Sequence, residues 1–317
     1  MKSFRLLSGL TIALLIAACT YAYLLVNDQA SIKITSLLAE SEHINGDSKR
    51  GEYVAIMGGC IACHTNFDDG GDPLAGGVSI TTPFGTFYSP NITSDENAGI
   101  GKWTGDDFLI AMSVGLSPDD EHYFPAFPYT AYSVMSVQEL VDLKAWLDTV
   151  EPVATKAPDH DIAWPFSVRG GLLLWKALFF DPFRTTNTAD RGSYLVNGPG
   201  HCAECHSPRN LLRGLTNRSL TGNSRGPDGE SVPGITSVDL SQWSVEDLEL
   251  FLEVGITLSG DFTGGHMTDV IEYGTGQMSS EDRTSIAQYL LSEANNCLLY
   301  TSPSPRDQRG SRMPSSA

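Results

Sequence analysis

Four cysteines and two histidines form two copies of one short motif. The first copy reads Cys60-Ile61-Ala62-Cys63-His64, and the second, Cys202-Ala203-Glu204-Cys205-His206, begins 142 residues later. Two thiols three positions apart on one helical turn reach the two vinyl groups of a porphyrin, and the histidine that follows projects an imidazole at the iron. The pattern therefore predicts two covalently bound haem c groups, attached through Cys60, Cys63, Cys202 and Cys205, with His64 and His206 as proximal iron ligands.

Two other chemistries also use paired cysteines. Four thiolates from two knuckles would bind zinc in a tetrahedron, and each pair would alternatively close a disulfide. The zinc site requires neither the histidine that directly follows each motif nor the separation of a domain length between them. A disulfide within such a tight loop is strained as a structural bridge. Haem attachment explains all of these features together.

A haem attached in this way leaves one axial position for a distal ligand. In the second half of the chain, Gly264-Gly265-His266-Met267 offers a methionine beside glycines that let the backbone approach the haem closely. We predict Met267 as the distal ligand, with His266 as the alternative. Met278 directly precedes a helix cap and is expected to pack in the core.

The first half has fewer candidates for the same role. Phe127 stands where a methionine would be expected, and Met135 is the nearest methionine. We predict Met135 as the distal ligand of the first haem, with core packing as its structural alternative. Met112 is a weaker candidate, and His122 would give a bis-histidine site instead.

The elements that must position these residues repeat along the chain. Gly51-Glu52-Tyr53 precedes the first motif as Gly192-Ser193-Tyr194 precedes the second, and Pro90–Thr93 corresponds to Pro233–Thr236. Helix caps repeat in the same order, with an acidic residue three positions after each Ser or Thr. The caps are Thr104 and Ser244 for a middle helix, and Ser136 and Ser279 for a terminal helix.

This repeat predicts an all-α fold of two tandem cytochrome c domains with long haem-wrapping loops, after an N-terminal membrane anchor. The predicted domains are residues 45–152 and 190–296. A connector at residues 153–189 contains an apolar stretch, Leu172–Phe180, that we expect to form a helix packed between the domains.

Both ends of the chain are set apart from these domains. Lys2 and Arg5 precede an apolar run from Leu10 to Val26, so residues 1–28 are predicted to be a signal anchor. The alternative is a lipoprotein signal with Cys19 as the acylated residue. Residues 297–317 resemble the translation of a transposon-type sequencing adapter, and a genuine Ser/Pro-rich tail is the alternative.

Several stretches resemble one family, the cytochrome c subunits of membrane-bound bacterial alcohol and gluconate 2-dehydrogenases. They are Thr82–Thr93, Gly99–Thr104 and His122–Tyr129 in the first half, and Gly200–Arg209 in the second. The resemblance implies that the protein passes electrons from a partner dehydrogenase subunit to quinone, an oxidase or another cytochrome of the respiratory chain. The predicted N-terminal signal would place the protein at the bacterial inner membrane with the folded domains facing the periplasm. Many members carry three haems, whereas this chain has two motifs.

Composition narrows the remaining functions. A net charge of −18 argues against a nucleic acid partner, which needs clustered Lys and Arg, and favours basic protein partners. The sequence has no phosphate-binding glycine loop and no nucleophile elbow, so we expect an electron-transfer protein and no catalytic residues of its own. The alternative is a di-haem enzyme, such as a peroxidase or thiosulfate dehydrogenase, which would need an open iron or an unusual ligand.

Overall fold

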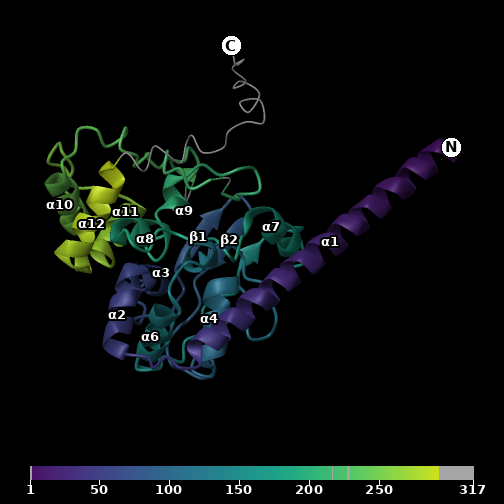
Figure 1. The fold of residues 1–317 in the computed structure, drawn as a ribbon, viewed down its shortest axis with the longest axis horizontal. Coiled ribbons are helices and arrows are strands. Elements are labelled where there is room, and N and C mark those ends of the chain that lie inside the picture. Colours follow the sequence, from purple (N-terminus) through teal and green to yellow (C-terminus); the bar gives the residue numbers. More distant parts are fainter. Residues whose placement is uncertain (1, 216, 227–228, 293–317) are drawn as a thin grey trace, which may run out of the picture.

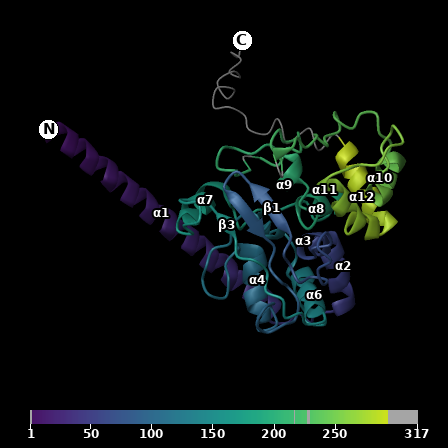
Figure 2. The same cartoon turned by 180° about the vertical axis from the view of Figure 1, so that it is seen from behind.

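Helices dominate the chain, and they follow the order of the repeat. The computed structural model describes residues 2–215, 217–226 and 229–292. In both views α2, α3, α4 and α6 form one group, and α8, α10, α11 and α12 form another beside it (Figures 1 and 2). The helices are α1 (Lys2–Ser41), α2 (Ser48–Met57), α3 (Cys60–His64), α4 (Gly105–Val114), α5 (Tyr129–Tyr132), α6 (Val137–Leu147), α7 (Gly171–Phe179), α8 (Arg191–Asn197), α9 (Ala203–His206), α10 (Val245–Val254), α11 (His266–Glu272), η2 (Thr275–Gln277) and α12 (Ser280–Leu291).

The first and last helices of each half pack closely against each other. Helix α2 lies against α6, and α8 lies against α12. A Cβ at Gly51 would lie 1.9 Å from the Asp142 carbonyl oxygen, and one at Gly192 would lie 2.0 Å from that of Ser285. Only glycine permits these backbones to approach so closely. The repeated Gly-x-Tyr sequence therefore marks the helix crossing in each half.

The helix boundaries predicted from the caps are confirmed. Thr104 and Ser244 each form a capping box with the aspartate three residues later, at the starts of α4 and α10. Ser136 and Ser279 accept hydrogen bonds from the backbone of the residue three positions on, at the starts of α6 and α12. These caps satisfy backbone N–H groups that a helix leaves without partners. The middle helices end at glycines in the left-handed region, Gly115 and Gly255.

Two tyrosines connect the halves, because each one bonds to the start of the terminal helix of the other half. The Tyr53 hydroxyl in α2 donates to Asp282 Oδ2 of α12 over 2.8 Å and accepts from the Ser279 N–H over 3.0 Å. Tyr194 of α8, its counterpart in the repeat, makes the same pair of contacts at the cap of α6, where it donates to Glu139 and accepts from the Ser136 N–H. Each half therefore holds the first turn of the other half's terminal helix.

A small antiparallel sheet shows that the all-α prediction is wrong, because the chain mixes helices with strands. Strand β1 (Ser79–Thr82) pairs with β2 (Gly85–Tyr88), and β2 pairs with β3 (Asp161–Ile162). A Cβ at Gly85, where φ is +131°, would lie 2.1 Å from the Asp161 carbonyl oxygen. The predicted haem-wrapping loop thus satisfies part of its backbone through a hairpin and a strand of the connector, a long-range pairing that loop composition does not reveal.

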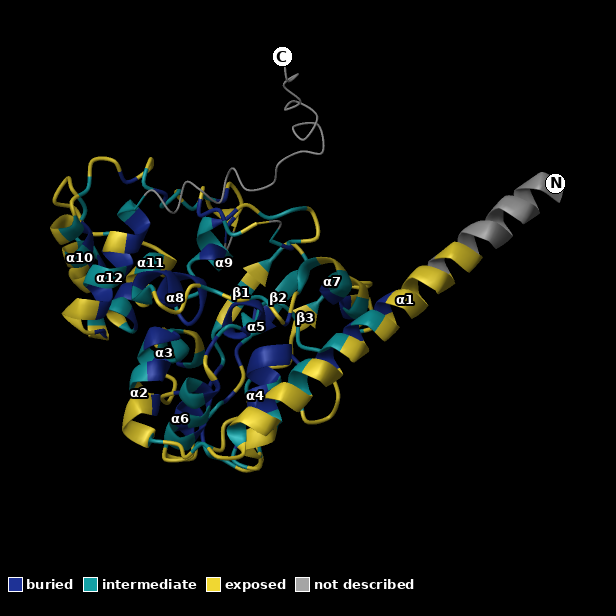
Figure 3. Ribbon diagram, viewed as in Figure 1, coloured by how far each residue is buried: buried dark blue, intermediate teal, exposed yellow. Residues whose placement is uncertain are grey.

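The predicted N-terminal membrane anchor is also wrong. Among the described residues, no helix combines the length and the apolar character needed to cross a bilayer. Helix α1 runs past the apolar segment into the polar sequence that follows it, and its far end projects from the rest of the protein (Figure 1). The apolar side chains on one face of its second half are buried against the folded domains (Figure 3), namely Ala22, Val26, Ala30 and Leu37. Part of the apolar run therefore serves the protein core.

The connector forms helix α7 as expected from its apolar stretch, and α7 packs against α1. Lys176 is fully buried and donates to the carbonyl oxygens of Val114 and Gly115, at 2.9 and 2.8 Å. Trp175 Nε1 donates to the Leu212 carbonyl over 3.0 Å. Helix α7 therefore bonds to both halves of the chain. The predicted adapter-derived tail, residues 297–317, lies outside the described residues.

Candidate haem-binding sites

The first motif folds as a single helical turn, α3, that places its two cysteines and its histidine together. Cys60 and Cys63 are free thiols. The Nδ1 atom of His64 lies 2.8 Å from the Pro90 carbonyl oxygen. When Nδ1–H donates to a carbonyl, the lone pair of the imidazole is on Nε2, where an iron would bind. The side chains are therefore held in the form that haem ligation requires.

The second motif repeats this geometry around α9. Cys202 occupies the N-cap position, and His206 ends the helix. The Nδ1 atom of His206 lies 2.8 Å from the Pro233 carbonyl oxygen, the same distance as at the first motif. Pro90 and Pro233 begin the two corresponding Pro-x-Ile-Thr segments. The sequence showed this repeat but did not reveal its role in orienting the histidines.

In both halves, a loop that contains a glycine keeps the proline carbonyl, which accepts from the histidine, close to the motif. The backbone N–H of Gly76 donates to the His64 carbonyl, and that of Gly222 donates to the His206 carbonyl, both over 2.7 Å. A Cβ at Gly76, where φ is +77°, would lie 2.5 Å from the Pro90 carbonyl carbon. Glycine is required there because the loop passes directly over the segment that orients the histidine.

The thiols of both motifs are held in the neutral form. Burial raises the pKa of Cys60 and Cys202 to about 12 and that of Cys63 to about 11. In the described part of the chain, no group of three or more His, Cys, Asp or Glu side chains could hold a metal ion, which argues against the zinc alternative. The described cysteines also form no disulfide with one another. Free, neutral thiols beside an oriented imidazole fit covalent haem attachment.

The structure places the two predicted distal methionines differently. Met135 is buried and directly precedes the cap of α6. Met267 lies in the first turn of α11 and is only partly buried. Met278, which directly precedes the cap of α12 and is buried, is the true counterpart of Met135 in the repeat. Met135 and Met267 remain predictions as ligands, and this correspondence identifies Met278 as the residue against which to test Met267.

His122 is engaged elsewhere and is disfavoured as a ligand. Its Nδ1 atom lies 2.9 Å from Lys176 Nζ. Burial, with a further contribution from Lys176, lowers the pKa of His122 to about 4, so the ring is neutral. Because Nδ1 accepts from the lysine, the ring proton is on Nε2, which then has no lone pair for iron. Met112 is buried within α4.

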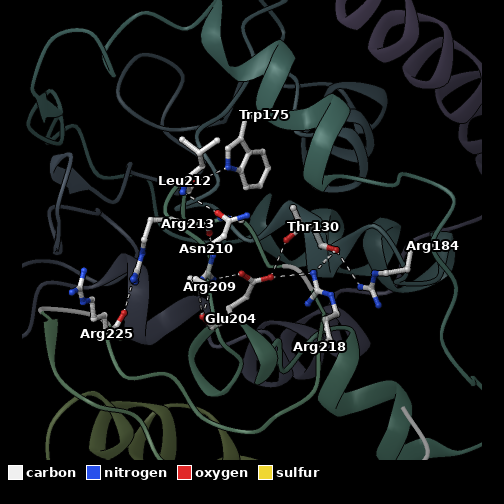
Figure 4. A network of polar contacts seen from close by, with 11 residues as sticks. Thr130, Trp175, Arg184, Glu204, Arg209, Asn210, Leu212, Arg213, Arg218 and Arg225 are labelled. Carbon is white, nitrogen blue, oxygen red and sulfur yellow. Dashed lines mark hydrogen bonds and ion pairs between the residues drawn. The ribbon is translucent and has the colours of Figure 1, made fainter. Parts of the chain in front are cut away.

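A network of ionic contacts surrounds the second motif (Figure 4). Glu204, the residue before Cys205, pairs with Arg209 at 2.5 Å and with Arg218 at 3.2 Å. It also accepts a hydrogen bond from Thr130 of α5 over 2.9 Å. Glu204, which lies inside the motif, thus connects the second half to the first, a role that its local sequence does not indicate.

The two motifs also contact each other through His201 and Tyr132. The Tyr132 hydroxyl donates to the Gly58 carbonyl over 3.0 Å, and the ring of His201 hydrogen-bonds the same oxygen. The two rings pack edge to face, with centroids 5.7 Å apart. Gly58 precedes Cys60 by two residues, and His201 directly precedes Cys202. Two oriented histidines, each beside paired thiols and joined by this contact, define a c-type cytochrome with two haem sites.

Comparisons with known proteins agree with that class, although no family model matches the chain. The chain is 43% identical over 258 residues to a dihaem cytochrome c-type protein of Cereibacter sphaeroides, covering 78% of this chain and 86% of that protein. It is 38% identical over 275 residues to the gluconate 2-dehydrogenase cytochrome c subunit of Pantoea cypripedii, covering 80% and 61%. It is also 38% identical over 261 residues to the cytochrome c subunit of the quinone-dependent alcohol dehydrogenase of Gluconobacter oxydans, covering 77% and 54%. The chain belongs to the family of dihaem c-type cytochromes.

The resemblance to the alcohol and gluconate dehydrogenase subunits is thereby confirmed. The chain spans slightly more than half the length of those two subunits. Relatives of this kind are cytochrome subunits of dehydrogenase complexes, which carry electrons onward. The prediction of two haem c groups agrees with the name of the dihaem relative.

Proposed function

We propose that this protein accepts electrons from a partner dehydrogenase and passes them through two haem c groups to the respiratory chain. The observation that carries the proposal is the matched orientation of His64 and His206 by the Pro90 and Pro233 carbonyls. A bound haem c supplies a one-electron couple between ferric and ferrous iron. The protein would supply two thioether attachments and one imidazole at each site.

The distal residues would decide between electron transfer and catalysis. A thioether from Met135 or Met267 would close each iron to small molecules and raise its reduction potential. An open iron would instead favour the peroxidase alternative. Met135 is enclosed in the core of the first half, and Met267 lies beside glycines on a partly exposed turn.

The names of the relatives support a dehydrogenase as the partner. We propose a dehydrogenase subunit as the electron donor, because the gluconate and alcohol dehydrogenase relatives are named as subunits of such complexes. A quinone, an oxidase or another cytochrome would be the acceptor. The protein would work on the periplasmic side of the bacterial inner membrane, and its charge of −18 would favour basic surfaces on its partners.

Mass spectrometry and absorption spectroscopy test the proposal directly. The chain is expressed with haem-attachment machinery, and we expect a mass gain of two haems and the spectrum of a low-spin c-type cytochrome. Replacing Cys60 and Cys63 with alanine should remove one haem, and replacing Cys202 and Cys205 should remove the other. Cys19→Ala, an exposed cysteine outside both motifs, should retain both haems. A colourless protein, or rapid carbon monoxide binding by the reduced protein, would contradict the proposed function.

A further inference from the structure

The two halves contain the same helix and turn, once covered and once open to solvent. In the first half α4 leads into the turn at residues 115–123, and in the second α10 leads into the turn at residues 255–263. The Tyr123 N–H donates to the Gly115 carbonyl over 3.0 Å. The Thr263 N–H donates to the Gly255 carbonyl over 2.8 Å in the same way. The repeat therefore keeps one backbone geometry at both places.

The side chains on this common backbone differ in burial. Val114 and Val254 are the last residues of the two helices, and they are 2% and 43% exposed. His122 and Phe262 each bridge back to the residue after the glycine. His122 is partly buried, whereas Phe262 is 73% exposed. Leu250, one turn before Val254, is exposed as well. The same surface is therefore covered in the first half and open in the second.

Two segments of this chain cover the surface in the first half. Val26 of α1 and Phe180, directly after α7, lie around a small cavity together with Val114. Lys176 of α7 donates to the carbonyl oxygens of Val114 and Gly115. A cation is favourable there because the C-terminal end of a helix carries partial negative charge. The cover therefore combines apolar side chains with one buried ammonium group.

The second half lacks both parts of this cover. Helix α10 lies at the opposite end of the protein from α1 in both views (Figures 1 and 2). Glu246, Leu250 and Val254 follow at intervals of four residues, so they share one face of the helix. The sequence from residue 226 to residue 282 contains several Asp and Glu but no Lys or Arg. This part of the chain therefore offers no cation of its own for the end of α10.

We propose that the α10 face, made of Leu250, Val254 and Phe262 with Glu246 and Asp261 beside them, binds a helix of the partner dehydrogenase. That helix would carry apolar side chains and a Lys or Arg, and would replace the cover that α1 and α7 give the first half. The acidic residues beside the apolar ones complement such a basic helix. The inference rests on the proposed function, which takes a dehydrogenase as the electron donor.

The apolar character of the face favours a lasting subunit complex over a brief encounter. Transient electron-transfer complexes have small interfaces, whereas permanent complexes bury larger and more apolar surfaces. The gluconate and alcohol dehydrogenase relatives are named as subunits, which fits a lasting complex. A second copy of this chain fits less well, because two molecules of charge −18 repel each other.

Binding to a defined dehydrogenase tests the inference. The probe is the catalytic subunit of the Pantoea cypripedii gluconate 2-dehydrogenase, purified without its own cytochrome, and interferometry measures its dissociation constant for the haem-loaded protein. Leu250→Gln and Phe262→Ser should each raise that constant about tenfold, because each removes an apolar contact. Glu246→Gln should weaken binding less and reduce its dependence on salt. Leu178→Gln, at an exposed position of α7, is the control and should bind like the native protein.

The outcomes separate the inference from the proposed function. Unchanged binding by Leu250→Gln and Phe262→Ser, an equal loss with Leu178→Gln, or no binding by the native protein would overturn the inference. Sedimentation of the protein alone tests the other occupant, because a dimer that Phe262→Ser dissociates would assign the face to a second copy. Gluconate is then added to the complex. If the native protein binds through the α10 face but its haems stay oxidised, the proposed function is wrong and the docking surface is still correct.

Discussion

The tyrosine contacts between the halves predict how strongly the two halves depend on each other. Tyr53→Phe removes the hydroxyl that donates to Asp282 over 2.8 Å and accepts from the Ser279 N–H over 3.0 Å. A hydrogen bond to a charged group contributes roughly 1.5–3 kcal/mol, and the exposed Ser279 N–H can turn to water after the change. We therefore expect Tyr53→Phe to lower the free energy of unfolding by about 2 kcal/mol. Tyr194→Phe should have a similar effect through Glu139.

The double variant tests whether the two contacts act as one interface. Arg191 lies 2.7 Å from Asp282 and 3.8 Å from Glu139, so it contacts the acceptors of both tyrosines. Residues that share a partner usually couple by at least about 0.5 kcal/mol. The combined loss should therefore differ from the sum of the single losses by at least that amount.

Denaturant unfolding of the haem-loaded protein, followed by far-UV circular dichroism, measures these effects. The slope of free energy against denaturant must stay constant for the comparison to hold. Tyr21→Phe serves as the control, because Tyr21 lies on α1 with 68% of its surface exposed. Losses below about 0.5 kcal/mol for both single variants, or strict additivity in the double variant, would refute the reasoning.

Two further predictions concern the distal ligand and the buried lysine. Met267→Ala should abolish the methionine-to-iron charge-transfer band of one ferric haem, whereas Met278→Ala should keep that band and lose about 2–5 kcal/mol of stability, because Met278 is buried in the core. The reverse pattern in the visible and near-infrared spectrum would reassign the ligand. Burial lowers the pKa of Lys176 to about 7, so between about pH 7 and pH 10 the unfolded chain binds the lysine proton more fully than the folded chain. Relative to Lys176→Met, the native protein should gain up to about 1.4 kcal/mol of stability per pH unit across that window, and equal slopes in unfolding experiments would contradict the lowered pKa.

The sequence alone was sufficient for the parts of this protein that depend on short spacings. Each haem-attachment motif is five residues long, so its chemistry can be read without a fold. The helix caps at Thr104 and Ser279 act over three residues, and their helices begin where the sequence predicts. The repeat of Gly-x-Tyr and Pro-x-Ile-Thr segments also revealed two similar halves, because duplicated units keep their local signals in the same order.

Tertiary structure decided what depends on residues distant in the chain. The strand β3 pairs with β2 across more than 70 residues, so an all-α fold was expected where a small sheet exists. Part of the N-terminal apolar run packs on the folded domains, which a count of apolar residues cannot distinguish from a lipid-facing surface. His122 is engaged by Lys176, and Glu204 is surrounded by arginines from separate segments. Charge and hydrogen bonding at a site depend on which side chains the fold brings within a few ångströms, and local spacing contains no information about those encounters.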